Sequence, residues 1–517
     1  MAMMSSLRYF GSVVMLLGVL AQPATAAQQS APLQAVKPKP ALSFDPSEFS
    51  AYTERARQDW KVPGMAVAVV RGNEILLIEG YGLRRIDTPA KVDNRTVFNI
   101  GSVTKSFTAA MIASLVADKK LALNDKVTKH LPGVLTGESA NDITIADLLS
   151  HRSGLAPVNY SVLGDVSRQD MLQRLQYLPR AASFRSNFVY NNFGYVASAA
   201  VAEKVTGSSW DQLIRDRLFQ PIGLADAVTS AAEQLKAANR ASPHGKIAER
   251  PTVVTPVPLR MVGPAGTIGM SIEDLARWVQ LHLNEGRVAE RQVLAPEMVR
   301  AMQAPHISQS VTPGLQAIWP STHFRAYGLG WFMRDYRGVK LLEHGGNTTG
   351  FTAHVAFVPE LDFGVAILSN MDSSPLPSAL LYRAVDMALG GELRDWSAEF
   401  QAANEPPAKK PEPVAAPARP ALPLDLYVGS YRSPLYGEAR VSRKGDKLIL
   451  QLTDQLTGEL TATGVNSFSA KWRDPYLAAV GSGGPFVFES VGTEPPKTLL
   501  FDLPGEKIVY TRVAGAS

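Results

Sequence analysis

The chain of 517 residues contains no cysteine. This absence excludes disulfide bonds, catalysis by a thiol and attachment of a lipid to a cysteine. A large excess of charge of one sign is also missing. The formal net charge is only +5, and Arg8, Lys37 and Lys39 supply three of these charges. Because no basic cluster alternates with aromatic residues either, we expect no nucleic-acid partner.

Patterns that bind metals or nucleotides are missing as well. The eight histidines are scattered along the chain, and no H-E-x-x-H motif occurs. The run "GSVTKS" at 101–106 lacks the Gly-Lys-Ser order of a phosphate-binding loop. The sequence therefore implies no metal and no other cofactor.

Long apolar runs are limited to the N-terminus. The run at 10–21 follows Arg8 and precedes the small-residue triplet A-T-A at 24–26. This order predicts a signal peptide over 1–26 that is cleaved after Ala26, and hence a secreted or periplasmic protein. No other segment is long and apolar enough to cross a bilayer, so we expect no stable membrane insertion. Residues 27–42 are rich in Gln, Ala and Pro and are expected to form a tether.

Strand patterns lie at both ends of a long region with helical patterns. Near the N-terminus, two apolar runs over 65–82 meet at Gly72-Asn73, which predicts a hairpin. Strand patterns return at 327–333, 339–346 and 351–370. We therefore expect an α+β fold for residues 43–396, with one antiparallel sheet built from both ends of the domain and flanked by the mostly helical middle.

The C-terminal part has a different composition. Residues 397–423 are rich in proline and are expected to be an extended linker. Beyond them, 424–517 consists of short apolar runs separated by Gly, Pro and Asp. This pattern predicts a small all-β barrel as a separate domain.

One serine and one lysine stand three residues apart at the start of a helical pattern, in "FNIGSVTKSFTAAMIASLV" at 98–116. Positions i and i+3 share one face of a helix, so Ser102 and Lys105 would point the same way. A hydroxyl beside an amine can be a nucleophile beside its base. An isolated pair would more often be a helix cap and a solvated lysine, so further motifs have to decide.

Two further motifs follow in the chain. Tyr190-Asn191-Asn192 precedes a helical pattern, and His344-Gly345-Gly346 ends a strand pattern. Two glycines there would leave the strand edge bare, so that a ligand could lie against the backbone. Three such motifs in this order are far less probable by chance than any one of them.

At these residues the sequence resembles the class C β-lactamase and D-alanyl-D-alanine carboxypeptidase family of serine hydrolases, which also contains esterases and D-amino-acid peptidases. The resemblance covers about 48 to 391 and the final segment resembles a β-barrel appended to some members. Matching stretches are "LLSHRSGL" at 148–155, "VYNNFGY" at 189–195, "FQPIGL" at 219–224, "DLARW" at 274–278 and "YGLGW" at 327–331.

The resemblance implies roles for individual residues. Ser102 would be the nucleophile, Lys105 its general base, and Tyr190 a proton relay to the leaving group. Substrate-binding residues would be Asn192, His344, Gly345, Gly346 and Asn347. Backbone N–H groups of Ser102 and Asn347 would form the oxyanion hole. A lysine desolvated in a cleft loses affinity for its own proton, so the assignment of the base is physically reasonable.

The neighbours of these motifs are expected to be structural. Tyr195 falls on a helix face that should be packed, so we assign it to the core. His151 is expected to fasten a loop. Glu343 should point to the opposite face of its strand from His344, because successive strand residues alternate.

These residues predict an exported serine hydrolase that acts through an acyl-enzyme. His344 stands where β-lactamases carry a charged lysine, and a mostly neutral histidine would hold a substrate carboxylate less well. This difference favours peptide or amide substrates, including D-amino-acid and cell-wall peptides, or small esters. A β-lactamase and a penicillin-binding sensor without turnover are the alternatives. The sequence leaves the oligomeric state open.

Overall fold

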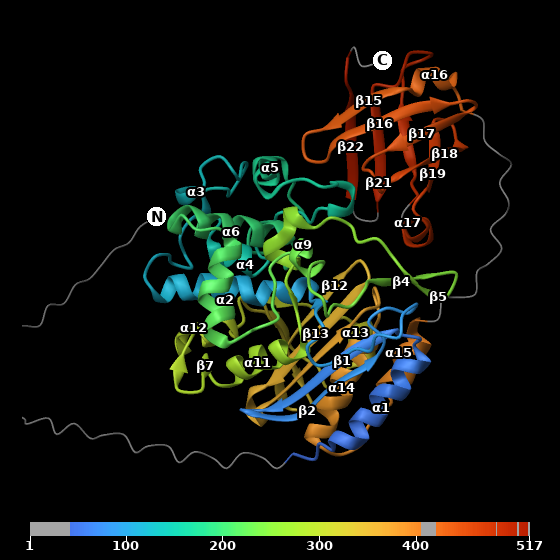
Figure 1. Cartoon of the computed structure of the whole chain (residues 1–517). Helices are drawn as coiled ribbons and strands as arrows, with labels where there is room; N and C mark the ends of the chain where they lie inside the picture. The colour runs from blue at the N-terminus through green and yellow to red at the C-terminus, as the bar shows by residue number, and fades with distance from the viewer. Residues whose placement is uncertain (1–41, 405–419, 482, 504–505, 515–517) are drawn as a thin grey trace, which may run out of the picture. The chain divides into compact units, whose positions relative to one another are not determined.

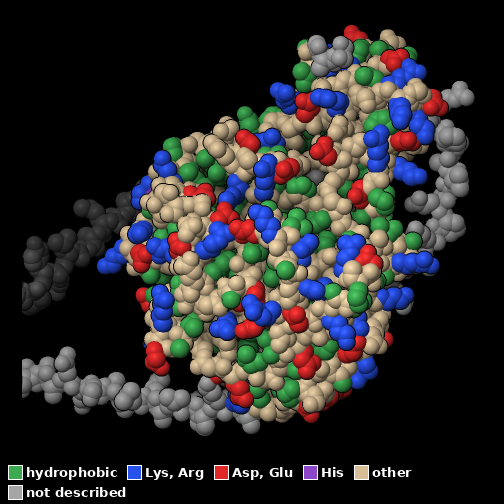
Figure 2. Space-filling view, viewed as in Figure 1, with side chains coloured by type: hydrophobic (Ala, Val, Ile, Leu, Met, Phe, Trp, Pro, Cys, Tyr) green, Lys and Arg blue, Asp and Glu red, His purple; other side chains and the backbone are tan. Residues whose placement is uncertain are grey.

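The computed structural model describes residues 42–404, 420–481, 483–503 and 506–514. The predicted signal peptide and nearly all of the predicted tether lie outside the described residues. None of the described helices is long and apolar enough to cross a membrane. On the face shown in Figure 2, acidic and basic side chains are intermixed.

The centre of the hydrolase-like part is an eight-stranded antiparallel sheet with the order β2-β1-β14-β13-β12-β11-β10-β9 (Figure 1). Its strands are β1 (Gly64–Arg71), β2 (Glu74–Gly82), β9 (Ile307–Gln309), β10 (Arg325–Tyr327), β11 (Phe332–Tyr336), β12 (Val339–Thr348), β13 (Phe351–Val358) and β14 (Phe363–Ser369). The N-terminal hairpin pairs with the C-terminal β14, with Met65 opposite Ser369. The expected α+β fold, with one sheet built from both ends of the domain, is confirmed.

Helices cover both faces of this sheet, and β1 shows why its sequence is apolar throughout. Met65, Val67 and Val69 enter the core beneath the helices α1 (Pro46–Asp59) and α14 (Leu376–Leu389). Ala66, Ala68 and Val70 face the other core, where α11 (Ile272–Leu283) packs. Strand residues alternate between faces, so a strand buried on both sides cannot show a polar face.

The middle of the chain forms the helical region. Every residue of α2 (Thr104–Ala117) from Thr104 to Leu115 is buried, so this helix lies inside the domain. The other helices of this region are α3 (Val127–His130), α4 (Ile145–Leu149), α5 (Arg168–Arg174), α6 (Asn192–Thr206), α7 (Trp210–Ile214), α8 (Gln220–Ile222), α9 (Ala231–Gln234), α10 (Gly263–Gly266), α12 (Pro296–Met302) and α13 (Pro313–Ile318). Short strand pairs are β3 (Phe98–Asn99) with β6 (Gly269–Met270), β4 (His244–Ile247) with β5 (Arg250–Val253), and β7 (Arg287–Val288) with β8 (Arg291–Gln292).

The C-terminal part is a closed eight-stranded barrel, as predicted. Its strands are β15 (Gly429–Ser433), β16 (Gly437–Lys444), β17 (Lys447–Gln451), β18 (Thr457–Gly464), β19 (Ser467–Trp472), β20 (Phe486–Glu489), β21 (Thr498–Leu503) and β22 (Glu506–Arg512). In β16, Ala439 and Val441 are buried while Arg440 and Ser442 are exposed, as a barrel wall requires. Two short helices, α16 (Leu424–Tyr427) and α17 (Pro475–Val480), accompany it.

The start of the predicted linker needs correction. The helix α15 (Trp396–Asn404) continues through the first residues of the segment that we expected to be extended. Trp396 anchors it, since its side chain is fully buried and Nε1 donates a hydrogen bond to Asp386 at 2.7 Å. Because the segment after 396 contains many polar residues, its composition did not predict this helix, which is anchored by the buried side chain of its first residue, Trp396.

Candidate active site

Ser102 lies in a tight turn just before α2. The turn is a 3-10 segment, Gly101–Val103, and Lys105 is the second residue of α2. Gly101 has a positive φ of 52°, which glycine adopts without strain. A Cβ at this position would also lie only 2.7 Å from the backbone nitrogen of Asn347. The turn therefore brings the serine against the end of β12.

The amine of Lys105 contacts the hydroxyl of Ser102. Nζ lies 2.9 Å from Ser102 Oγ, and it donates a hydrogen bond to the carbonyl of Ala265 at 2.9 Å. The lysine is fully buried, and no described carboxylate lies within ion-pair distance of it. Burial therefore lowers the pKa of Lys105 well below its ordinary value. A neutral amine in this position can accept the proton of Ser102.

Tyr190 completes this group. Nζ of Lys105 lies 4.7 Å from the centre of the Tyr190 ring, and a side-chain hydrogen bond joins Tyr190 to Ser102. Burial raises the pKa of Tyr190 above 10, although the bond to Ser102 opposes this effect. The phenol is therefore protonated near neutral pH. Of the residues predicted from sequence, the structure brings Ser102, Lys105 and Tyr190 together.

Asn191 and His151 fix the loop that carries Tyr190. The side chain of Asn191 caps α6 by accepting from the N–H groups of Phe193 at 2.8 Å and Gly194 at 3.3 Å. Its own backbone N–H donates to Nδ1 of His151 at 3.1 Å. His151 thus fastens a loop, as expected. Asn192 is the first residue of α6, and its side chain is partly exposed.

The glycines of β12 differ in what surrounds them. A Cβ on Gly346 would lie 2.0 Å from the carbonyl oxygen of Ile100 and 2.9 Å from the nitrogen of Ser102. The bare edge that we expected to face a ligand is therefore filled at Gly346 by the serine turn. A Cβ on Gly345 would meet its nearest atom only at 3.8 Å. Close packing at Gly346 brings the backbone of Asn347 beside that of Ser102.

His344 is buried, with only 1% of its surface exposed. Its Nδ1 lies 2.7 Å from the carbonyl oxygen of Gly345 and its Nε2 lies 3.0 Å from the hydroxyl of Tyr327. Since a carbonyl only accepts, Nδ1 carries the proton and Nε2 accepts from Tyr327. Burial, with the nearby Lys105, lowers the pKa of His344 to about 3. The imidazole is neutral and closed off by Tyr327.

Glu343 lies on the other face of β12, as predicted. Its carboxylate pairs with Arg334 at 2.6 Å and with His354 at 3.3 Å, and it accepts from the hydroxyl of Tyr382. Although burial opposes it, Arg334 holds the pKa of Glu343 well below its ordinary value. Glu343 therefore does not charge His344 by direct pairing.

Sequence reasoning missed the role of Tyr327. The residue belongs to the stretch "YGLGW", which we used only as evidence for the resemblance to the family and to which we assigned no role in the site. Its hydroxyl also lies 3.4 Å from that of Tyr195, which is buried as expected and donates to the carbonyl of Leu149 at 2.6 Å. The signal lay in a buried tyrosine, whose hydroxyl requires a partner. The sequence did not indicate which partner that would be.

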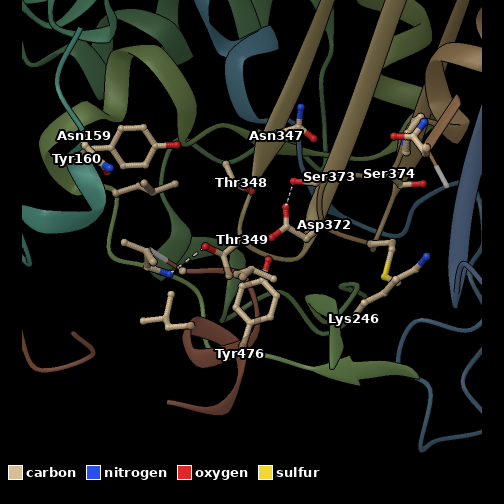
Figure 3. Close-up of a pocket in the computed structure, with 18 of the residues that line it drawn as sticks. Asn159, Tyr160, Lys246, Asn347, Thr348, Thr349, Asp372, Ser373, Ser374 and Tyr476 are labelled. Carbon is tan, nitrogen blue, oxygen red and sulfur yellow. Dashed lines mark hydrogen bonds between the residues drawn. The ribbon is translucent and has the colours of Figure 1, made fainter. Parts of the chain in front are cut away.

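A cavity of about 900 Å³ opens beside this group at the end of β12 (Figure 3). Its polar lining includes Asn347 and, from the turn after β14, Asp372 and Ser373. Tyr160 borders it from the helical region, and Tyr476 from helix α17. No group of three or more His, Cys, Asp or Glu side chains that could hold a metal occurs among the described residues.

Comparison with known proteins identifies the family. The Beta-lactamase family model matches residues 49–388, and a model named Domain of unknown function (DUF3471) matches 414–502. The chain therefore belongs to the beta-lactamase family, which confirms the resemblance found in its motifs. This membership places the chain among serine hydrolases of the β-lactamase and penicillin-binding type.

Individual relatives agree with this membership. An unguisins hydrolase of Aspergillus violaceofuscus is 30% identical over 461 residues, covering 80% of this chain and 78% of its own. Penicillin-binding protein 4 of Amycolatopsis lactamdurans is 28% identical, over 74% of this chain and 96% of its own. The solved octameric penicillin-binding protein homologue from Pyrococcus abyssi matches with a TM-score of 0.60 at 21% identity, covering 90% of this chain and all of its own. That structure supports the fold.

Proposed function

We propose that this protein is an exported serine hydrolase that cleaves peptide or amide bonds, and small esters, through an acyl-enzyme formed on Ser102. The observation that carries this proposal is the 2.9 Å contact between Ser102 Oγ and the buried Nζ of Lys105. Serine is a poor nucleophile until a neighbour takes its proton. A lysine without its proton is a suitable acceptor.

The reaction runs in two halves. Ser102 Oγ attacks the substrate carbonyl carbon while its proton passes to Lys105, and the carbonyl becomes an oxyanion. The backbone N–H groups of Ser102 and Asn347 bind this oxyanion, and Tyr190 relays the proton from Lys105 to the leaving amine or alkoxide. Water then attacks the acyl-Ser102 ester and gives a proton to Lys105, which returns it to Ser102 Oγ as the acid is released. Asn192 contacts the bound substrate.

The surroundings of His344 support a preference against substrates that need a carboxylate anchor. The imidazole ring of His344 is buried and neutral, and its Nε2 already accepts a hydrogen bond from Tyr327. Similarity to a protein named as a hydrolase of unguisins supports turnover over mere acylation. Short peptides, including those of the cell wall, are the substrate class that we propose.

The test is a comparison of kcat/KM for nitrocefin, p-nitrophenyl acetate and D-alanine p-nitroanilide. We expect turnover of the ester and the anilide. A β-lactam hydrolysed orders of magnitude faster than both would identify a β-lactamase. Stable acylation by a β-lactam without turnover of any substrate would identify a sensor. Mass spectrometry of the mature N-terminus tests export, with cleavage after Ala26 expected.

A further inference from the structure

Asp372 is a carboxylate without a cation in the cavity beside the site. It follows β14 and is half-buried. Its carboxylate accepts from the hydroxyl of Ser373 at 2.9 Å (Figure 3) and from the backbone N–H of Gly350. It forms no ion pair with any residue that the structure describes. Burial makes the charged form of a carboxylate costly and raises the pKa of Asp372 above its ordinary value, and a cationic ligand would offset this cost.

Hydrogen bonds tie the Asp372 turn to the strand end that carries Asn347. Oγ1 of Thr352 lies 2.9 Å from Oδ1 of Asn347 and 2.8 Å from the carbonyl oxygen of Met371. The same atom accepts from the backbone N–H of Ser374 at 3.1 Å. Asp372 is therefore held in a fixed position relative to the backbone that we assign to the oxyanion hole.

Tyr160 borders the same cavity from the helical region. Burial and, less strongly, the charge of Asp372 raise the pKa of Tyr160 above its ordinary value. Asp372 and Tyr160 both line the cavity (Figure 3). The cavity that Asp372 and Tyr160 line also reaches Asn347, whose backbone we assign to the oxyanion hole.

The charges on the cavity wall favour a cation at Asp372. Lys246 is the one lysine or arginine among the described lining residues, and its side chain is exposed. It forms no described ion pair with Asp372 (Figure 3). Water and salt screen an exposed charge more than a half-buried one. A ligand carboxylate placed near Asp372 would be repelled.

We propose that Asp372 binds the protonated amino terminus of the substrate, so that the cavity is a subsite for short peptides or amino-acid amides with a free amine. This inference rests on the proposed function and names its substrate class. An α-amino group has a pKa of about 8 and is mostly cationic near neutral pH. The ammonium group would replace the missing partner of Asp372, while the carbonyl to be attacked lies at Ser102.

The test compares matched amides with a free and a blocked amine. D-alanine p-nitroanilide, D-alanyl-D-alanine p-nitroanilide and their N-acetyl forms are assayed with the full chain, Asp372→Asn and Asp372→Glu. Asp372→Asn should lower kcat/KM for the free amines about 10- to 100-fold, mainly through KM, because one charged hydrogen bond is lost. It should change the acetylated substrates and p-nitrophenyl acetate less than about 3-fold, and Asp372→Glu should keep part of the preference.

The exposed Asp142 supplies the matched control, since Asp142→Asn removes a carboxylate that pairs only at the surface. Equal losses on free and acetylated substrates, or no loss on the free amines, would overturn the proposal. If the wild type cleaves neither anilide, amide hydrolysis is wrong. Calorimetric titration with D-alaninamide and N-acetyl-D-alaninamide then tests the subsite alone. Binding of only the free amine, lost in Asp372→Asn, supports it; no binding to the wild type rejects it.

Discussion

The hydroxyl of Tyr327 lies 3.0 Å from Nε2 of His344, and both side chains are buried. Tyr327→Phe would leave a buried imidazole nitrogen without a donor. We expect the free energy of unfolding to fall by about 1–3 kcal/mol, the usual cost of an unsatisfied buried polar group. Urea denaturation measures this, and Tyr177→Phe at an exposed position is the control. An unchanged stability would show that the contact with His344 is not a hydrogen bond.

The pH dependence should come from Lys105 and not from His344. The base must be unprotonated, so kcat/KM for p-nitrophenyl acetate should fall as the pH drops through the pKa of Lys105. Burial lowers this pKa, so activity should persist well below pH 10.5, into the neutral range. The pKa of His344 is about 3, so this residue stays neutral from pH 5 to 9. The pH–rate profile of His344→Gln should therefore keep the same shape.

A limb near pH 6.5 that disappears in His344→Gln would contradict this expectation. It would mean that the histidine titrates in the free enzyme.

Ser102, Lys105 and Tyr190 should behave as one unit. Ser102→Ala should abolish turnover and labelling by a fluorophosphonate probe, whereas Ser47→Ala, at an exposed serine, should change neither. Lys105→Ala and Tyr190→Phe should each slow acylation about 10²- to 10⁴-fold. Their combined loss should be smaller than the product, because both act on the same proton. Single-turnover kinetics measure this, and losses that multiply would assign Tyr190 to packing.

The two glycines of β12 offer a pair of variants that differ in packing alone. Gly346→Ala would push a methyl group to 2.0 Å from the carbonyl of Ile100, so the turn carrying Ser102 must move. We expect a loss of at least about 100-fold in kcat/KM, since small misplacements of reacting groups are costly. Gly345→Ala has room and should stay close to wild type. Similar kinetics for both variants would show that the backbone N–H groups assigned to the oxyanion hole can be displaced without loss of activity.

The sequence was informative where a local pattern determines the structure. The two apolar runs that meet at Gly72-Asn73 predicted the hairpin of β1 and β2, and the spacing of Ser102 and Lys105 placed them on one face. The motifs also identified the protein family to which the chain belongs. Contacts between distant segments are not contained in such patterns. The Tyr327 hydroxyl that closes off His344 and the filling of the Gly346 edge depend on how β10, β12 and the serine turn meet in space.

The same reason explains why Asp372 and the helix at the start of the predicted linker were missed. A carboxylate after a strand is unremarkable in sequence, and only the cavity shows that no described cation pairs with it. The helix at 396–404 has only two large apolar residues, Trp396 and Phe400, so its composition resembled the linker that follows.

The last prediction concerns Tyr476 of helix α17, which lines the cavity from the barrel. A Cβ on Gly245 of β4 would lie only 2.3 Å from the Tyr476 ring, so the two are in close contact. Further contacts join barrel and hydrolase domain, since Arg174 donates to the carbonyl of Leu435 at 3.2 Å and Gln455 to that of Pro256 at 3.1 Å. The barrel should therefore limit the length of substrate that the cavity admits.

Tyr476→Ala would remove part of this wall without touching Ser102, Lys105 or Tyr190. We expect kcat/KM for a hexapeptide to rise several-fold relative to D-alanine p-nitroanilide, because a longer chain can use the space that the Tyr476 ring fills, whereas a short substrate does not need it. A chain ending at Asn404 should show the same shift more strongly and remain folded by circular dichroism. Val465→Ala, at a barrel position 79% exposed, is the control. If the ratio of long to short substrates is the same in all four proteins, the barrel does not select substrates by length.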